Sequence, residues 1–165
     1  MRMNHVRNAL QLLGFAIILG ILGCQAIPKV HDHFNRNSPL ETVRFFRYCV
    51  DAGEYRLAYE SLTAETQKQV SELQFNGLVR FVDVPELDGL GLRDLIVKSK
   101  VDPVPEHLGP GTGSWWVTLI WESADQYIEY SLRLVPLQGS DIAENPQWRL
   151  DLLNPRGLDF GGSGP

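Results

Sequence analysis

The apolar residues of this chain change their spacing part-way along the sequence, and this change constrains the fold more than any other feature. Between Ser38 and about Val82 they recur every three or four positions, as they do along one face of an α-helix. From Ser114 onwards they alternate with other residues, as they do in β-strands with one buried face. Helices followed by consecutive strands predict an α+β fold in which helices pack on an antiparallel sheet.

The helical part is expected to contain three helices. The segment Ser38–Glu41 (SPLE) combines a capping serine, a proline suited to the first turn and a capping-box glutamate, so the first helix should begin there. Its apolar stripe includes Cys49, which we expect to be a buried thiol rather than a nucleophile, and Arg47 should lie on the opposite, solvent-facing side. Further helices are expected over residues 55–62 and 64–82.

The second part is expected to contain four strands, over residues 94–101, 114–123, 126–137 and 147–153. In the strand over 114–123, the odd-numbered positions from Trp115 to Trp121 should face the helices, so Trp116 and Ile120 should lie on the outer face of the sheet. The Pro/Gly-rich segment 102–113 is expected to be a loop.

Trp116 and Ile120 form a candidate surface for self-association or for a protein partner, because an exposed aromatic–aliphatic pair on a sheet is typical of such surfaces. If the pair is exposed, Trp116→Ser should weaken an oligomer and leave the fold intact. The alternative is that the loop over 102–113 or the carboxyl-terminal segment covers both residues. Loss of folding would then show that Trp116 belongs to the core.

The amino terminus has the features of an export signal. Residues 1–8 carry Arg2 and Arg7 and no acid, and residues 12–22 are an unbroken apolar run. Crossing a hydrocarbon core takes about 20 apolar residues, so a run of this length suits a signal peptide better than a membrane span. The alternative is an uncleaved anchor.

The apolar run ends in Ile21-Leu22-Gly23-Cys24, which resembles the lipobox of bacterial lipoproteins. The resemblance implies cleavage between Gly23 and Cys24 and a diacylglyceryl group on the Cys24 sulfur, and two or three acyl chains such as palmitate hold a protein stably on a membrane. The alternative is a signal peptide without lipidation. Gln25, rather than Asp, follows the cysteine, and by resemblance to enteric lipoproteins this implies the outer membrane of a two-membrane envelope.

The expected organisation is therefore a signal peptide over 1–23, a lipidated cysteine and tether over 24–37, one folded domain over 38–153 and a flexible tail over 154–165. The expected location is the bacterial cell envelope, outside the cytoplasm. A mature chain beginning at Cys24 would contain 13 basic and 20 acidic residues. This acidic balance, without a basic cluster, speaks against a nucleic-acid partner.

The folded domain resembles the nuclear transport factor 2-like superfamily, particularly its small bacterial lipoproteins. The resemblance is carried by Ser38-Pro-Leu-Glu-Thr-Val, Asp51-Ala-Gly-Glu-Tyr, Ala58-Tyr-Glu-Ser-Leu-Thr and Trp148-Arg-Leu-Asp-Leu. It implies a cone, in which a curved antiparallel sheet wraps around the amino-terminal helices. It implies little about function, because the superfamily contains ketosteroid isomerases, dehydratases and proteins without known activity.

No cofactor or metal site is expected. His31 and His33 flank one residue but have no third ligand nearby, and two cysteines make neither a disulfide framework nor a cysteine-rich zinc site. The one histidine of the folded domain, His107, falls in the predicted loop. Five charged residues should form a cross-strand ladder on a solvated face: Glu122, Glu129, Arg133, Arg149 and Asp151.

Because no inward acid–base pair is apparent, we expect a membrane-tethered binding or interaction module without catalytic activity. The alternative is a small-molecule binder or an isomerase- or dehydratase-like enzyme that uses a buried carboxylate and a tyrosine inside the cone. A pocket of a few hundred Å³ holding a carboxyl group with a raised pKa would favour that alternative. A solidly packed interior would oppose it.

Overall fold

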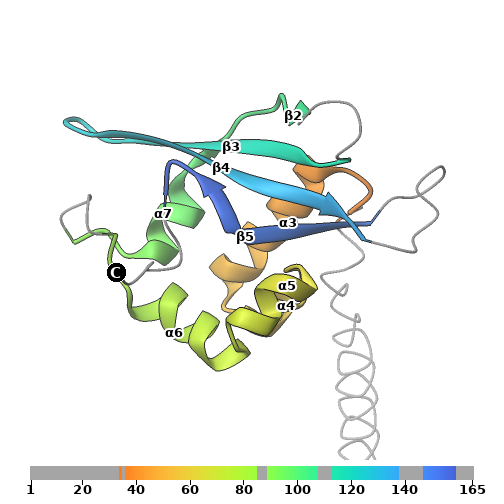
Figure 1. The fold of residues 1–165 in the computed structure, drawn as a ribbon. Helices are drawn as coiled ribbons and strands as arrows, with labels where there is room; N and C mark the ends of the chain where they lie inside the picture. Colours follow the sequence, from red (N-terminus) through yellow and green to blue (C-terminus); the bar gives the residue numbers. More distant parts are fainter. Residues whose placement is uncertain (1–33, 35, 85–88, 108–112, 138–146, 159–165) are drawn as a thin grey trace, which may run out of the picture. The chain divides into compact units, whose positions relative to one another are not determined.

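A computed structural model describes residues 34, 36–84, 89–107, 113–137 and 147–158. The chain divides into two units, residues 1–33 and 34–165, and all described residues belong to the second. The predicted signal peptide, Gly23 and Cys24 therefore lie outside the described residues. The described part contains five helices and an open antiparallel sheet of five strands (Figure 1), so the predicted α+β class is confirmed.

Helix α3 (Pro39–Ala52) begins after a capping serine and ends at a glycine. The Ser38 hydroxyl accepts a hydrogen bond from the Glu41 backbone N–H at 3.2 Å, which satisfies one of the free donors of the first turn. The helix ends at Gly53, whose φ of 77° is a left-handed conformation that glycine adopts without steric cost. The start predicted from the sequence is confirmed.

The single helix predicted over 64–82 is wrong, because the chain forms two helices there. After α4 (Tyr55–Glu60) come α5 (Ala64–Gln69) and α6 (Glu72–Phe81). Val70 takes an extended conformation, and Ser71 then caps a new helix. The Ser71 hydroxyl accepts from the Gln74 N–H at 3.3 Å and the Gln74 side chain accepts from the Ser71 N–H at 2.9 Å, which is a capping box.

The strand predicted over 94–101 is also wrong, because most of this segment is helix α7 (Leu92–Lys98). Leu95 and Ile96 of this helix and its C-cap residue Ser99 are buried, and a spacing of three to four is helical rather than alternating. An ion pair of 2.8 Å between Lys98 Nζ and Asp94 Oδ2 joins successive turns. Only strand β1 (Lys100–Val101) remains of the predicted strand.

The remaining strands are β2 (Glu106–His107), β3 (Trp115–Glu122), β4 (Tyr127–Pro136) and β5 (Trp148–Arg156). The order across the sheet is β1-β3-β4-β5, and β2 pairs with a second part of the same β3 edge that β1 uses. The last three strands match the predicted ones, whereas β2 lies in the segment predicted as a loop.

Strand β5 continues into the segment predicted as a tail, to Arg156. Its pairing with β4 shifts by several residues between Asp151 and Arg156, so the strand bulges there. It ends at Gly157, where φ is 81° and an added Cβ would lie 2.4 Å from the Glu129 carbonyl oxygen. Residues 159–165 of the predicted tail lie outside the described residues.

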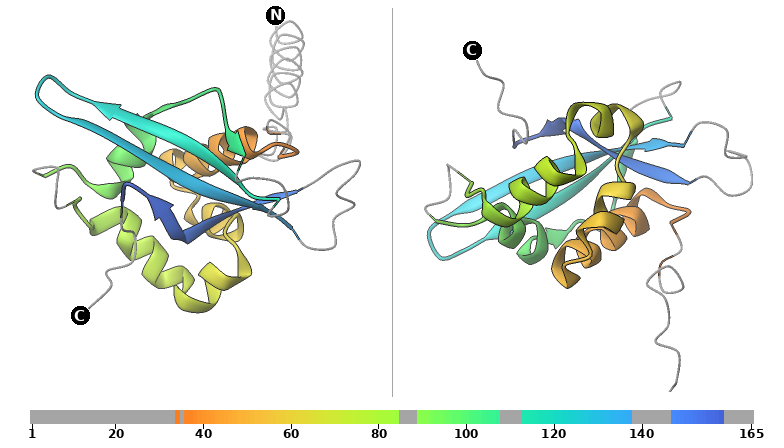
Figure 2. Two further views of the ribbon diagram at one scale, coloured as in Figure 1. Left: turned by 45° about the horizontal axis from the view of Figure 1, so that its top comes forward. Right: turned by 90° about the horizontal axis from the view of Figure 1, so that it is seen from below.

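The helices cover one face of the sheet, as both views in Figure 2 show. The alternation predicted for β3 and β4 is confirmed, because Val117, Leu119, Leu132 and Leu134 are at most 1% exposed and face the helices. From the helical side, Phe46 is 1% exposed and Cys49 is fully buried, as predicted.

Arg47 does not face solvent, which corrects the sequence prediction. It is half-buried between α3 and the end of α7, where Nε donates to the Ile96 carbonyl at 2.8 Å and Nη2 to the Val97 carbonyl at 2.6 Å. Nη2 also donates to the Ser99 carbonyl. These acceptors lie at the negative end of the α7 dipole, so one guanidinium fastens α7 to α3.

Two buried weak acids, Tyr130 and Cys49, make the fold less stable at alkaline pH. Burial raises the pKa of Tyr130 to about 12 and the pKa of the Cys49 thiol to about 11. Each of these pKa values is higher in the folded chain than in the unfolded chain, so the unfolded chain loses the proton at a lower pH. The free energy of unfolding therefore falls above about pH 9 because of Cys49 and above about pH 10 because of Tyr130.

We therefore expect Tyr130→Phe to flatten the loss of stability between pH 10 and 12, by up to about 2 kcal/mol relative to the unaltered chain. Urea titrations at pH 8, 10 and 12 measure this difference. Because Tyr48 is 46% exposed, Tyr48→Phe is the matched control and should leave most of the alkaline dependence in place. Equal effects of the two substitutions would contradict the assignment to Tyr130.

Candidate functional site: an outer groove over two strands

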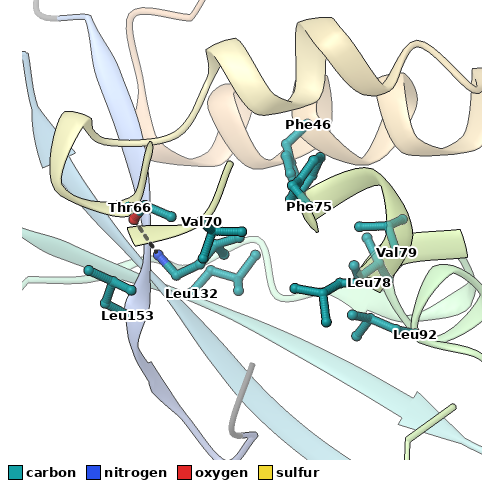
Figure 3. A pocket seen from close by; sticks show the side chains of 11 residues that line it. Phe46, Thr66, Val70, Phe75, Leu78, Val79, Leu92, Leu132 and Leu153 are labelled. Atoms are coloured by element: carbon teal, nitrogen blue, oxygen red, sulfur yellow. Dashed lines mark hydrogen bonds between the residues drawn. The ribbon is translucent and has the colours of Figure 1, made fainter. Parts of the chain in front are cut away.

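The structure has a small hollow between the helices and the sheet, which we call the interior cavity. Its volume is about 50 Å³. Figure 3 shows the side chains that line it, among them Phe46 from α3, Phe75 and Leu78 from α6, and Leu132 from β4. Among the described residues that line it, Thr66 is the one with a polar side chain, and its hydroxyl accepts from the Leu152 N–H at 3.3 Å. None of the described residues lining the cavity carries a carboxyl group.

A larger hollow lies on the outer face of β4 and β5, beside α5. This outer groove has a volume of about 650 Å³, which falls in the range typical of ligand sites. It is lined by Thr63, Ala64, Glu65, Gln69, Ser114, Arg133, Val135, Pro136, Leu137, Arg149, Asp151, Leu153 and Asn154. It forms because α5 starts at the β5 edge, where the Thr63 N–H donates to the Leu150 carbonyl at 2.8 Å.

Asp151 organises the floor of the outer groove. The residue is 7% exposed, and its carboxylate accepts from the Leu153 backbone N–H at 3.0 Å and from the Asn154 side-chain amide at 2.9 Å. Arg133, its partner on β4, approaches with Nη1 at 3.4 Å from Oδ2. The carboxylate thereby holds the bulged end of β5 and leaves little acceptor capacity for anything else.

The two arginines of the outer groove lie on neighbouring strands. Arg133 pairs with Asp151 in the β4–β5 register and Val135 pairs with Arg149, so the two arginines are diagonal neighbours on one face. Diagonal neighbours have Cβ atoms about 7–8 Å apart, which long side chains bridge. Among the described residues, Arg149 makes no ion pair and Arg133 Nε is buried without an acceptor.

The charge ladder predicted on this face is present only in part. Arg133 and Asp151 form its cross-strand pair. Glu122 instead pairs with Lys100 of β1 at 3.5 Å, and the Glu129 carboxylate accepts from the Tyr127 hydroxyl at 2.8 Å. Alternation along the strands correctly predicts that Arg133 and Arg149 lie on the outer face. It does not predict the groove, since no sequence pattern shows that α5 forms its wall.

Trp116 is not exposed, which corrects the expectation on which the predicted interaction surface rests. Its side chain is 6% exposed, and the Arg156 guanidinium carbon lies 4.4 Å from the centre of its ring. Arg156 also pairs with Glu106 at 3.3 Å, and Glu106 is the β2 neighbour of Trp116. Ile120 is half-buried. Glu106 belongs to the segment 102–113 and Arg156 to the carboxyl-terminal segment. These are the two segments that the sequence analysis gave as the alternative cover for Trp116.

Other candidate groups lie apart from both hollows. His107 is exposed at the end of β2 and packs its ring edge-on against Trp115, with ring centres 4.7 Å apart. In the part of the chain that the structure describes, no three His, Cys, Asp or Glu side chains lie close enough together to hold a metal ion. The same residues include no helix of sufficient length and apolarity to span a membrane. His31 and His33 lie outside the described residues.

These observations define the class of the protein as an α+β domain with an open antiparallel sheet and a polar groove on its outer face. Comparisons with protein-family models, with curated proteins and with solved structures found no match to this chain.

Proposed function

We propose that this chain is a lipid-tethered binding module of a bacterial envelope, without catalytic activity, and that the outer groove is its binding site. The observation that carries the binding role is the contrast between the two hollows. The outer groove holds about 650 Å³ between charged and amide side chains, whereas the interior cavity holds about 50 Å³ and is lined almost wholly by apolar groups.

We propose further that the domain is a nuclear transport factor 2-like cone. The supporting features are a capped first helix, short helices after it, and the antiparallel succession β3-β4-β5 packed against them. The residues that resemble the superfamily lie at structurally important points. Ser38 caps α3, and Trp148 Nε1 donates to the Asn37 carbonyl at 3.1 Å, which links β5 to the start of that helix.

The tether places the domain near the membrane. Phe34 packs against Phe45 and Tyr48 of α3, with ring centres 5.7 and 5.3 Å apart, so Phe34 is in contact with the folded domain. Phe34 follows the proposed lipid on Cys24 by ten positions in the sequence. At about 3.5 Å per residue when fully extended, these positions reach about 35 Å. A ligand of the outer groove would therefore be found at or close to the membrane surface.

We expect the protein extracted from bacterial membranes to have the mass of Cys24–Pro165 plus a diacylglyceryl or triacyl group. Mass spectrometry of the intact protein measures this directly. Cys24→Ser should abolish the lipid and release the chain from the membrane fraction, because serine provides no thiol for the thioether bond. Cys49→Ala is the matched control and should keep the lipid. An unmodified full-length mass would instead make residues 12–22 an anchor and would contradict the tether.

The alternative, catalysis inside a cone, has weaker support. It needs an acid or base facing a cavity of useful size. Tyr130 is the buried tyrosine nearest to that description, but its hydroxyl already contacts the Ser99 hydroxyl at 3.2 Å and the Leu95 carbonyl at 3.5 Å. The buried carboxylate of Asp151 lines the outer groove instead.

A further inference from the structure

We propose that the outer groove binds an oxyanion, a carboxylate or phosphate group carried by a larger and partly apolar molecule, and that Arg149 and Arg133 hold this group. The proposal deepens the binding role given above and rests on it. It assigns a ligand chemistry and two ligand-contacting residues to the groove.

Arg149 is the first argument. It is half-buried on the outer face of β5, and within the described residues no carboxylate forms an ion pair with it. Burial lowers the pKa of its guanidinium and the nearby Arg36 lowers it further, while Glu60 opposes them. Glu60 is itself bound to Arg56 at 2.9 Å. A half-buried cation in these surroundings is stabilised by an added anion.

Arg133 is the second argument. A guanidinium carries five N–H donors, and its contacts here are weak. Nη1 lies 3.4 Å from Asp151 and Nη2 lies 3.5 Å from the Ser114 hydroxyl, both at the long limit for hydrogen bonds. Nε is buried and meets no acceptor among the described residues. Arg133 is thus positioned by Asp151 while it keeps donor capacity.

The remaining lining decides the sign and the size of the ligand. Two carboxylates face the groove, Asp151 and Glu65. Asp151 accepts from the Leu153 N–H and the Asn154 amide, so its carboxylate is held by the end of β5, whereas Glu65 is exposed on α5. Val135, Pro136 and Leu153 supply apolar area beside the arginines, and Gln69 supplies an amide. A small inorganic ion would leave most of about 650 Å³ unfilled, which favours an oxyanion on a larger body.

The test follows the arginine Nε–H signals in ¹H–¹⁵N NMR spectra of the full chain in a zwitterionic detergent. The probes are inorganic phosphate and acetate at constant ionic strength, and phosphatidylcholine with or without phosphatidylglycerol incorporated into the detergent micelles. We expect saturable shifts of two arginine signals. Arg149→Gln should remove one of them and weaken binding at least tenfold. Arg44→Gln is the charge-matched control, because Arg44 lies on α3, is half-exposed and, among the described residues, forms an ion pair with Glu41 alone. This variant should bind like the unaltered chain.

Each outcome decides the proposal. Saturation by phosphate or acetate that Arg149→Gln weakens supports a soluble or polymer-borne oxyanion. Saturation only by micelles that contain phosphatidylglycerol supports a lipid headgroup. The proposal would be overturned if the shifts never saturated in the unaltered chain, a result that does not depend on the variants folding well. It would also be overturned if Arg44→Gln and Arg149→Gln altered the shifts equally. If the mass shows no lipid while the shifts saturate, the tether fails and the anion site stands. If a lipid is present but no shift saturates, the ligand chemistry alone is wrong.

Discussion

Arg47→Ala is expected to lower the free energy of unfolding by about 3 kcal/mol and the melting temperature by about 10 °C. The substitution removes a cation that donates to the carbonyls of Ile96, Val97 and Ser99 at the end of α7. Hydrogen bonds from charged donors contribute more than neutral ones, and a cation at a helix carboxyl end is stabilising in addition. Thermal unfolding followed by circular dichroism measures the loss.

Arg44→Ala is the matched control, since Arg44 lies one turn away on the same helix and pairs with Glu41 in an exposed position. Exposed ion pairs contribute little, so we expect a change of about 0.5 kcal/mol or less. Arg47→Lys should recover only part of the stability, because an ammonium cannot reproduce the planar fork of a guanidinium. If Arg44→Ala and Arg47→Ala lowered the melting temperature equally, the contact between α3 and α7 would not have the role that we give it.

Trp116→Ser is expected to destabilise the fold by about 3 kcal/mol, because it removes a large buried ring from β3 and leaves a hollow behind. This differs from the expectation for an exposed interaction surface, for which the same substitution leaves folding intact. The structure favours destabilisation because the ring is 6% exposed and lies beneath Arg156. Urea unfolding measures the change, and light scattering at the same concentration reports the oligomeric state.

Ile120→Ser separates the two explanations, since Ile120 lies on the same face of β3 but is only half-buried. We expect this variant to lose less stability than Trp116→Ser. A Trp116→Ser protein of unchanged stability that lost an oligomer would instead restore the predicted surface. A loss of stability without any change in scattering would place Trp116 in the core.

Alternation and capping were readable from the sequence because both are local. The Ser38 cap, the burial of Cys49 and the inward faces of β3 and β4 follow from spacing along one element, and the structure agrees with each of them. The errors arose where signals were short. A capping box at Ser71 divides a stretch whose spacing predicts one helix, and α7 is too short for its period to be distinguished from alternation.

The sequence alone specified the α+β class of the fold, the capped start of α3 and the inward faces of β3 and β4, because capping and periodicity are local properties of a single element. What covers each face depends on contacts between elements that are distant in the sequence. Arg47 reaches carbonyls about 50 positions along the chain, Arg156 covers Trp116 from another strand, and α5 forms the wall of the groove in which Arg133 and Arg149 lie. These contacts join residues distant in sequence, and a single sequence has no local pattern that encodes such pairings.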